Sequence, residues 1–227
     1  MTGVKEGYGK GGGESILGSL GVVILAGGRG TRIGRDKCLL ELCGKPLLLY
    51  VIEKALMLEP DRVVVVLGRR NLERYGSMVP SRVSLSEDIV EGVGPLAGIV
   101  SGMRRIDTDY ALILPCDTPF IKLDVLRFLY DKAGEADAVI PRWPNGYIEP
   151  LQAFYRTSAA LKAAEEALLE AGRSCREMIR RLNRILYVNV DELRRIDPEL
   201  ITFFNINSMD DLLRAEKFLK GSITTLK

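Results

Sequence analysis

A glycine-rich, basic segment follows the first apolar run of the sequence, and its residue types suit a polyanionic ligand. The segment runs Leu25-Ala26-Gly27-Gly28-Arg29-Gly30-Thr31-Arg32-Ile33-Gly34-Arg35-Asp36-Lys37. Glycines allow backbone N–H groups to turn toward a triphosphate and approach it closely. Three arginines and a lysine add positive charge. The segment predicts a phosphate-binding loop, although a strand-to-helix turn with solvated basic side chains would use the same residues.

Two other glycine motifs fit this segment poorly. The dinucleotide fingerprint needs G-x-G-x-x-G and an acid at the end of the second strand. Here Gly34 comes one position late after Gly28 and Gly30, and the second apolar run ends in Leu67-Gly68 without an acid. The P-loop pattern G-x-x-x-x-G-K-[ST] does not occur. Neither of these two sites is predicted.

Asp117 is the candidate metal ligand. It follows the apolar run Tyr110–Leu114, and an acid just past a buried strand lies where open α/β sheets bind ligands. Mg²⁺ prefers one or two carboxylates together with substrate phosphates. The alternative is that Asp117 caps a helix that begins near Ile121. The chain has no histidine, so a Ser-His-Asp triad and a histidine-held metal are excluded.

Composition indicates a globular protein without a nucleic-acid or membrane partner. The chain has 227 residues, 47% of them hydrophobic, and a formal net charge of +2. This charge gives no reason to expect nucleic-acid binding, and no apolar run approaches the roughly 20 residues that span a membrane. Four cysteines form no CxxC pair, which disfavours zinc. Scattered thiols suit a reducing cytoplasm, where we expect the protein.

Apolar runs alternate with helical patterns along the chain. Predicted strands are 22–26, 62–67, 82–85, 110–114, 137–140, 151–155 and 185–190, and predicted helices are 46–58, 95–106, 123–133, 157–171, 174–182 and 208–219. This alternation predicts an α/β fold: a single three-layer domain with a mostly parallel sheet flanked by helices. Residues 1–20 are glycine-rich without apolar periodicity, so we expect a flexible arm there and the domain over residues 21–227.

The motifs resemble those of MobA-type molybdenum cofactor guanylyltransferases. The likeness begins with Leu25–Gly28, Arg32 and Asp36-Lys37, and continues through Gly44-Lys45-Pro46. It implies a Rossmann-like nucleotidyltransferase fold in which the backbone of Leu25, Ala26, Gly27 and Gly28 holds the nucleotide. The likeness also implies catalytic roles for Lys37, which binds the phosphates, and for Arg32.

Three downstream motifs extend the resemblance. Asp88 precedes Gly94-Pro95-Leu96-Ala97-Gly98 and is expected to contact the nucleotide. In Pro115-Cys116-Asp117-Thr118-Pro119-Phe120, the resemblance makes Asp117 the Mg²⁺ ligand and a catalytic residue. Asn205 and Asn207 match a closing N-x-N-[ST] motif on the acceptor or metal side. A helix cap at Ser208 and Asp211, with Asn207 as a turn residue, is the alternative.

The expected acceptor site lies in the C-terminal half. The resemblance implies a phosphorylated pterin there, and Glu149, Arg173 and Arg176 are its candidate ligands because arginine forks fit phosphate. The implied reaction transfers GMP from GTP to molybdenum-molybdopterin with Mg²⁺ and releases pyrophosphate. A molybdoenzyme or a molybdenum-insertion protein is a further expected partner. Alternatives are an adenosylcobinamide-phosphate guanylyltransferase, a cytidylyltransferase for the same pterin, and a non-catalytic NTP-binding subunit.

Overall fold

A seven-stranded sheet forms the centre of the protein. The computed structural model describes residues 18–27, 37–68, 75–88, 94–223 and 225–226. The strands of the sheet lie in the order β5-β4-β1-β6-β8-β7-β9. Their bounds are Leu20–Ala26 for β1, Arg62–Leu67 for β4, Ser84–Glu87 for β5, Tyr110–Pro115 for β6, Ala138–Arg142 for β7, Ala153–Arg156 for β8 and Ile185–Asn189 for β9. Only β8 among these strands runs antiparallel to its neighbours.

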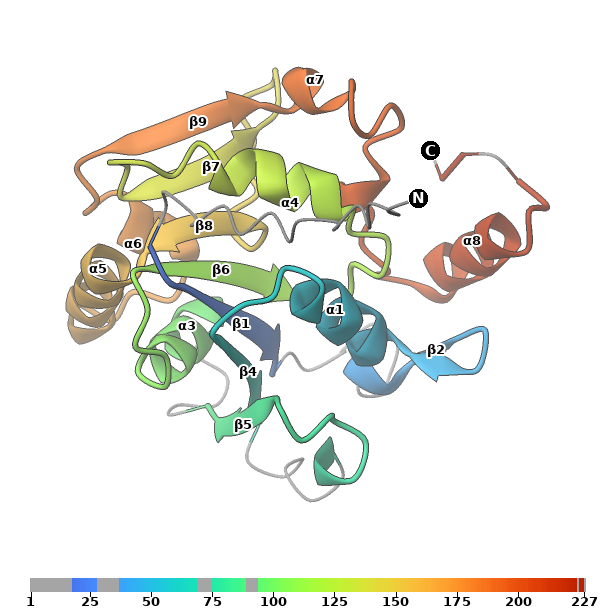
Figure 1. Cartoon of the computed structure of the whole chain (residues 1–227), viewed down its shortest axis with the longest axis horizontal. Helices are drawn as coiled ribbons and strands as arrows, with labels where there is room; N and C mark the ends of the chain where they lie inside the picture. The colour runs from blue at the N-terminus through green and yellow to red at the C-terminus, as the bar shows by residue number, and fades with distance from the viewer. Residues whose placement is uncertain (1–17, 28–36, 69–74, 89–93, 224, 227) are drawn as a thin grey trace, which may run out of the picture.

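Helices cover both faces of this sheet, as Figure 1 shows. Val22 and Ile24 of β1 belong to the core beneath α1 (Leu47–Leu56) and α4 (Leu123–Tyr130), whereas Val23 belongs to the core with α3 (Pro95–Met103). Helices α5 (Thr157–Leu169) and α6 (Cys175–Ile179) share the second core. Successive strand residues point to opposite faces, so the continuous apolar runs of the strands supply both cores. The predicted three-layer α/β fold is confirmed.

Helix α3 packs very closely on the sheet. A Cβ atom at Gly102 would lie 2.2 Å from a methyl carbon of Val23 and 3.0 Å from one of Val66. Only glycine allows this approach of helix backbone to strand side chains. The last turn of α3 is thereby held against β1 and β4.

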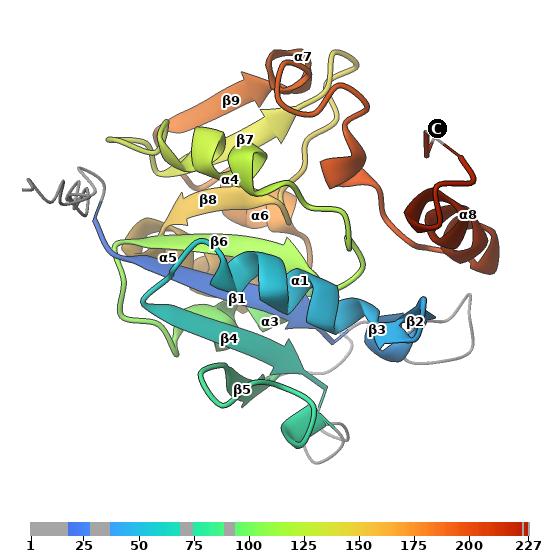
Figure 2. The same cartoon turned by 45° about the vertical axis from the view of Figure 1, so that its right-hand side comes forward.

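A smaller core joins the C-terminal helix to an early hairpin. The hairpin pairs β2 (Glu41–Leu42) with β3 (Lys45–Pro46), and α8 spans Met209–Leu219. Leu42, Ile206 and Leu212 are buried together. In Figure 2, α8 lies apart from the main sheet on the side of β2. This packing brings the Asn205–Ser208 segment to Lys37.

Most predicted elements are confirmed with shifted ends. The helix predicted over 46–58 spans Leu47–Leu56, and the one predicted over 174–182 spans Cys175–Ile179. The hairpin β2–β3, the short helix α7 (Val190–Leu193), and the 3₁₀ turns η1 (Lys37–Leu39) and η2 (Ile201–Phe203) were not predicted. No helix in the described ranges is long and apolar enough to cross a bilayer.

Residues just before the predicted domain start at Gly21 make contacts with the rest of the protein. Strand β1 starts at Leu20. The backbone N–H and hydroxyl of Ser19 donate to Asp109 Oδ2 at 2.7 and 2.8 Å, and the Tyr130 hydroxyl donates to the Gly18 carbonyl at 2.6 Å. These bonds from Ser19 lower the pKa of Asp109. Gly18 and Ser19 therefore contact the sheet and its helices, while residues 1–17 lie outside the described ranges, so the division into an arm and a domain stays a prediction.

We expect two N-terminal truncations to differ. Removing residues 1–17 should leave the melting temperature unchanged, because that glycine-rich sequence has no apolar face to bury. Removing residues 1–20 should lower it by several degrees, because buried Leu20 and the Ser19–Asp109 bonds are lost. Calorimetry of both truncated proteins checks this. Equal melting temperatures would show that residues 18–20 contribute nothing to the fold.

Cys38 and Cys116 form a disulfide that the sequence analysis did not predict. Their Cα atoms lie 5.6 Å apart, and the bond closes a loop with a sequence separation of 78 residues. Cys43 and Cys175 are free thiols. Native disulfides typically stabilise a domain by about 2–5 kcal/mol. The description of all four cysteines as unpaired, scattered thiols is therefore wrong for this pair.

Candidate active site

The predicted site residues follow strands that end at one edge of the sheet. Strands β1, β4, β5 and β6 run parallel, so their carboxyl ends meet there. Gly27 follows β1, Asp88 follows β5, and Cys116-Asp117 follow β6. Strand β7 runs in the same direction as β6, because β8 is antiparallel to both. Open α/β sheets bind ligands at this edge.

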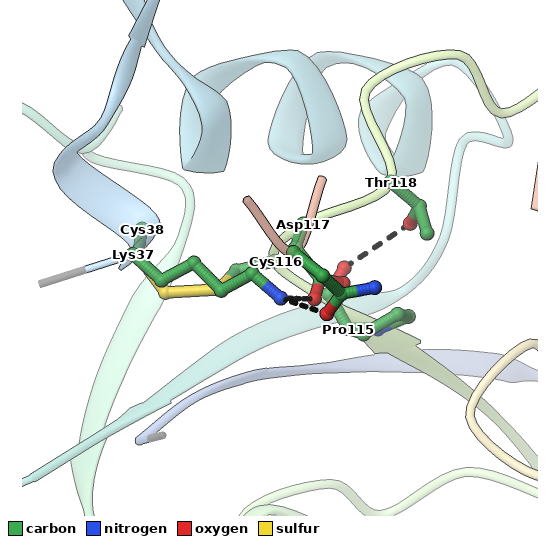
Figure 3. Close-up of a disulfide and its surroundings, with 7 residues drawn as sticks. Lys37, Cys38, Pro115, Cys116, Asp117 and Thr118 are labelled. Atoms are coloured by element: carbon green, nitrogen blue, oxygen red, sulfur yellow. Dashed lines mark hydrogen bonds and ion pairs between the residues drawn. A yellow bond between two sulfur atoms is a disulfide. The ribbon is translucent and has the colours of Figure 1, made fainter. Parts of the chain in front are cut away.

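Lys37, Asp117 and Asn207 form a charged cluster at this edge. The Lys37 ammonium pairs with Asp117 Oδ2, and it donates to Asn207 Oδ1 at 2.7 Å. Both members of the ion pair are mostly buried, with 18% and 15% of their side-chain surfaces exposed. Figure 3 shows the Lys37 side chain reaching toward Asp117. Three motifs that are far apart in the sequence therefore meet at the Lys37 ammonium.

The segment that carries Asn207 is fixed on both sides. The Ile206 N–H donates to the Asp117 carbonyl at 3.0 Å, and the Asn207 N–H donates to Asp211 Oδ2 at 3.0 Å. Ser208 caps α8 by accepting from the Asp211 N–H at 3.1 Å. The predicted cap is confirmed, and it orients Asn207 in addition to starting the helix. Asn207 is therefore more than a turn residue.

Asp117 does not cap a helix. Helix α4 begins at Leu123 with Lys122 in the cap position, and the Lys122 N–H donates to Thr202 Oγ1 at 3.2 Å. Asp117 Oδ1 is buried and has no hydrogen-bond partner among the described residues. A buried oxygen acceptor without a donor fits a hard cation. No group of three or more metal-ligating side chains exists in the described ranges, so phosphate or water oxygens would complete the coordination.

Asp88 lies beside Gly27 and Gly98. Its N–H donates to the Leu67 carbonyl at 2.8 Å, which extends the strand pairing by one residue. Its carboxylate Oδ2 lies 3.7 Å from the position that a Cβ at Gly27 would take, and 3.9 Å from the corresponding position at Gly98. The structure thus brings the LAGG and GPLAG motifs together around one carboxylate.

Arg173 lies against the start of α3. Gly94 has φ +92°, and a Cβ there would lie 2.6 Å from the Arg173 carbonyl oxygen. The Glu177 carboxylate accepts from the N–H groups of Ser174 and Arg173 at 2.7 and 2.9 Å, which lowers the pKa of Glu177. This capping box fixes the loop before α6. The side chains of Arg173 and Arg176 are exposed, so both can take an anionic ligand.

The side chains of Glu149 and Asn205 form hydrogen bonds to residues outside the Lys37 cluster. Trp143 Nε1 donates to Glu149 Oε1 at 2.7 Å, and burial raises the pKa of Glu149 while this bond partly offsets the effect. The Asn205 side chain donates to the Phe203 carbonyl at 3.0 Å within its own loop. Among the described residues, Asn207 is the asparagine of this pair that hydrogen-bonds to Lys37.

Two predicted site residues, Gly28 and Arg32, lie outside the described ranges, and their roles stay predictions. Cys38 and Cys116 also lie at the site and were not predicted from the sequence. A usable pattern was present, because Cys38 follows Lys37 directly and Cys116 precedes Asp117 directly. Each cysteine therefore adjoins one member of the charged pair.

Comparison with known proteins gives the family. Residues 22–185 match the family described as MobA-like NTP transferase domain. The chain is 32% identical to a probable molybdenum cofactor guanylyltransferase of Methanosarcina mazei, over 84% of this chain and 87% of that protein. A protein with the same name from Thermococcus kodakarensis is 34% identical over 84% and 91%.

A solved structure agrees with these relatives. The molybdopterin-guanine dinucleotide biosynthesis protein A of Archaeoglobus fulgidus superposes with a TM-score of 0.75 at 37% identity. The match covers 88% of this chain and 99% of that one. The family match over residues 22–185 includes Lys37, Asp88 and Asp117. The chain belongs to the MobA-like NTP transferase family.

Proposed function

We propose that this protein transfers GMP from GTP to the phosphate of molybdenum-bearing molybdopterin and releases pyrophosphate. The product is a guanine dinucleotide form of the cofactor. The observation that carries the proposal is the meeting of Lys37, Asp117 and Asn207 at the carboxyl edge of the sheet. The names of the relatives supply the nucleotide and the acceptor.

The residues of the site act by positioning and by charge neutralisation. A phosphate oxygen of the acceptor attacks the α-phosphorus of GTP, and the bond from that phosphorus to the bridging oxygen of pyrophosphate breaks. An ionised phosphate needs no general base. Lys37 exchanges the Asp117 carboxylate for phosphate oxygens when the triphosphate enters, because its charge suits both partners. Transfer of this kind depends on orientation and on stabilisation of developing negative charge.

Asp117 would hold Mg²⁺ through its buried Oδ1. The ion supplies charge neutralisation at the phosphates and polarises the phosphorus that is attacked. Arg173, exposed beside the start of α3, and Arg176, exposed on α6, would receive the acceptor phosphate. Glu149, held by Trp143, lies past β7 on the acceptor half. A molybdoenzyme or a molybdenum-insertion protein that takes the product is part of the same proposal.

A transfer assay tests this function. The protein is incubated with the magnesium form of GTP, CTP or ATP and with molybdenum-molybdopterin, metal-free molybdopterin or adenosylcobinamide phosphate. Pyrophosphate and the nucleotide product are measured. We expect product with GTP and molybdenum-molybdopterin, and none after EDTA treatment. Product with CTP would favour the cytidylyltransferase, and product with the cobinamide would favour that acceptor. Binding of GTP without pyrophosphate in any combination would favour the non-catalytic subunit.

A further inference from the structure

The Cys38–Cys116 disulfide joins the two segments that carry the charged pair of the site. Lys37 and Asp117 are the immediate neighbours of the two cysteines. In Figure 3 the disulfide runs alongside the Lys37 side chain, whose ammonium lies at Asp117. We propose that this disulfide is a positioning element for nucleotidyl transfer, and that its reduction slows transfer in a domain that stays folded. The proposal rests on the proposed function.

One end of the bond is anchored in the sheet. The Cys116 N–H donates to the Leu25 carbonyl at 3.2 Å, which continues the pairing of β1 with β6 past the end of β6. The Ile206 N–H fixes the carbonyl of Asp117. Asp117 is thereby held by the sheet on one side and by the Asn205–Ser208 segment on the other.

The other end of the bond lies in a short element. Cys38 occupies the middle of the three-residue 3₁₀ turn η1, and Lys37 is its first residue. A lysine side chain is flexible and reaches many positions from a mobile backbone. A covalent bond from the next residue to the rigid β6 end restricts the Lys37 backbone. The ammonium is then pre-set near Asp117 before a nucleotide binds, which avoids an ordering cost during the reaction.

Reduction changes this restraint in a defined way. A dithiol reductant gives two electrons and two protons, the bond between the two Sγ atoms breaks, and the reductant becomes a cyclic disulfide. Cys38 and Cys116 then carry thiols. Only 1% and 6% of the surfaces of these two residues are exposed. The thiols therefore stay buried in the core after reduction, and water does not enter. The expected change is a looser Lys37 segment and an intact sheet.

The remaining cysteines provide the control. Cys175 is buried, and burial raises the pKa of its thiol to about 12, so it is unreactive at neutral pH. Cys43 is an exposed free thiol in the turn between β2 and β3. Cys43→Ser therefore removes a thiol without touching the disulfide or the charged cluster.

The first experiment compares kcat for oxidised wild type, wild type reduced with dithiothreitol, and Cys38→Ala/Cys116→Ala. Alanine avoids burying an unpartnered hydroxyl. Assays run below the melting temperature of the reduced protein, with circular dichroism confirming the fold.

We expect kcat to fall about 10-fold or more in the reduced and double-variant proteins, since small misplacements of catalytic groups cost up to about 100-fold. Reoxidation should restore wild type only, and Cys43→Ser should behave as wild type in both states. An unchanged kcat in folded, reduced protein overturns the proposal.

A double-mutant cycle separates positioning from general stabilisation. If the disulfide acts through Lys37, reduction should not slow Lys37→Ala further. If both losses multiply in full, the disulfide acts elsewhere and the proposal is wrong. Calorimetric titration of Mg-GTP into oxidised and reduced protein is independent of turnover. We expect weaker binding after reduction, and equal affinity would count against positioning even if no acceptor is found. Absence of transfer by the oxidised protein would instead refute the proposed function.

Discussion

Replacing Asp117 by asparagine should lower kcat by about 10²-fold or more while the domain stays folded. This loss matches the usual cost of removing one electrostatic stabiliser from an active site. Asparagine keeps the size of the side chain and one oxygen, but it removes the negative charge that pairs with Lys37 and that a cation requires. The fold should tolerate the change, because the backbone contacts of Asp117 through its carbonyl do not depend on the carboxylate.

Two controls accompany this substitution. Asp124→Asn removes an exposed carboxylate in the first turn of α4, where it pairs with Arg127, and should leave kcat unchanged. EDTA should abolish wild-type transfer. Full magnesium-dependent turnover by Asp117→Asn would rule out its role as metal ligand. An unfolded variant would show that the carboxylate is needed for the structure.

The central fold was predictable because strand residues are nearly continuous apolar runs. Consecutive apolar residues in a strand point to opposite faces, so both faces of the strand must be buried. A sheet with helices on both sides provides such positions for Val63–Leu67 and Ala111–Leu114. The antiparallel direction of β8 was not predictable, because its pairing with β6 and β7 depends on where a long connection returns. Five of the six predicted helices were ended two or three residues late, since apolar periodicity continues into the turns that follow, whereas the last helix ends at Leu219 as predicted.

The site was predicted motif by motif, but its contacts were not. The sequence named Lys37, Asp117 and Asn207 from three separate segments, and the structure confirms that these three lie together. It gave no means of choosing between Asn205 and Asn207, because the choice depends on a helix cap that turns one side chain toward Lys37. The disulfide was missed although each cysteine adjoins a predicted site residue, because a pairing over 78 residues follows only once Lys37 and Asp117 are placed side by side.

Replacing Lys37 by alanine should lower kcat/KM for GTP by about 10- to 150-fold, which corresponds to the roughly 1.5–3 kcal/mol of a charged hydrogen bond. The ammonium neutralises phosphate charge in the proposed reaction, and no other cation pairs with Asp117 among the described residues. The variant also leaves a mostly buried carboxylate without its partner, so we expect a lower melting temperature. Steady-state kinetics and calorimetry measure the two effects separately.

The kinetic and thermal effects of Lys37→Ala have different causes, and a second substitution distinguishes them. In Lys37→Ala/Asp117→Asn the unpaired charge is absent, so the melting temperature should recover toward that of wild type while transfer stays slow. Lys220→Ala is the matched control, because Lys220 pairs with Glu216 on an exposed face at the end of α8 and should change neither quantity. An unchanged kcat/KM in Lys37→Ala would identify this lysine as a structural partner of Asp117. Recovery of transfer in the double variant would lead to the same conclusion, since slow transfer would then come from the unpaired carboxylate and not from the missing ammonium.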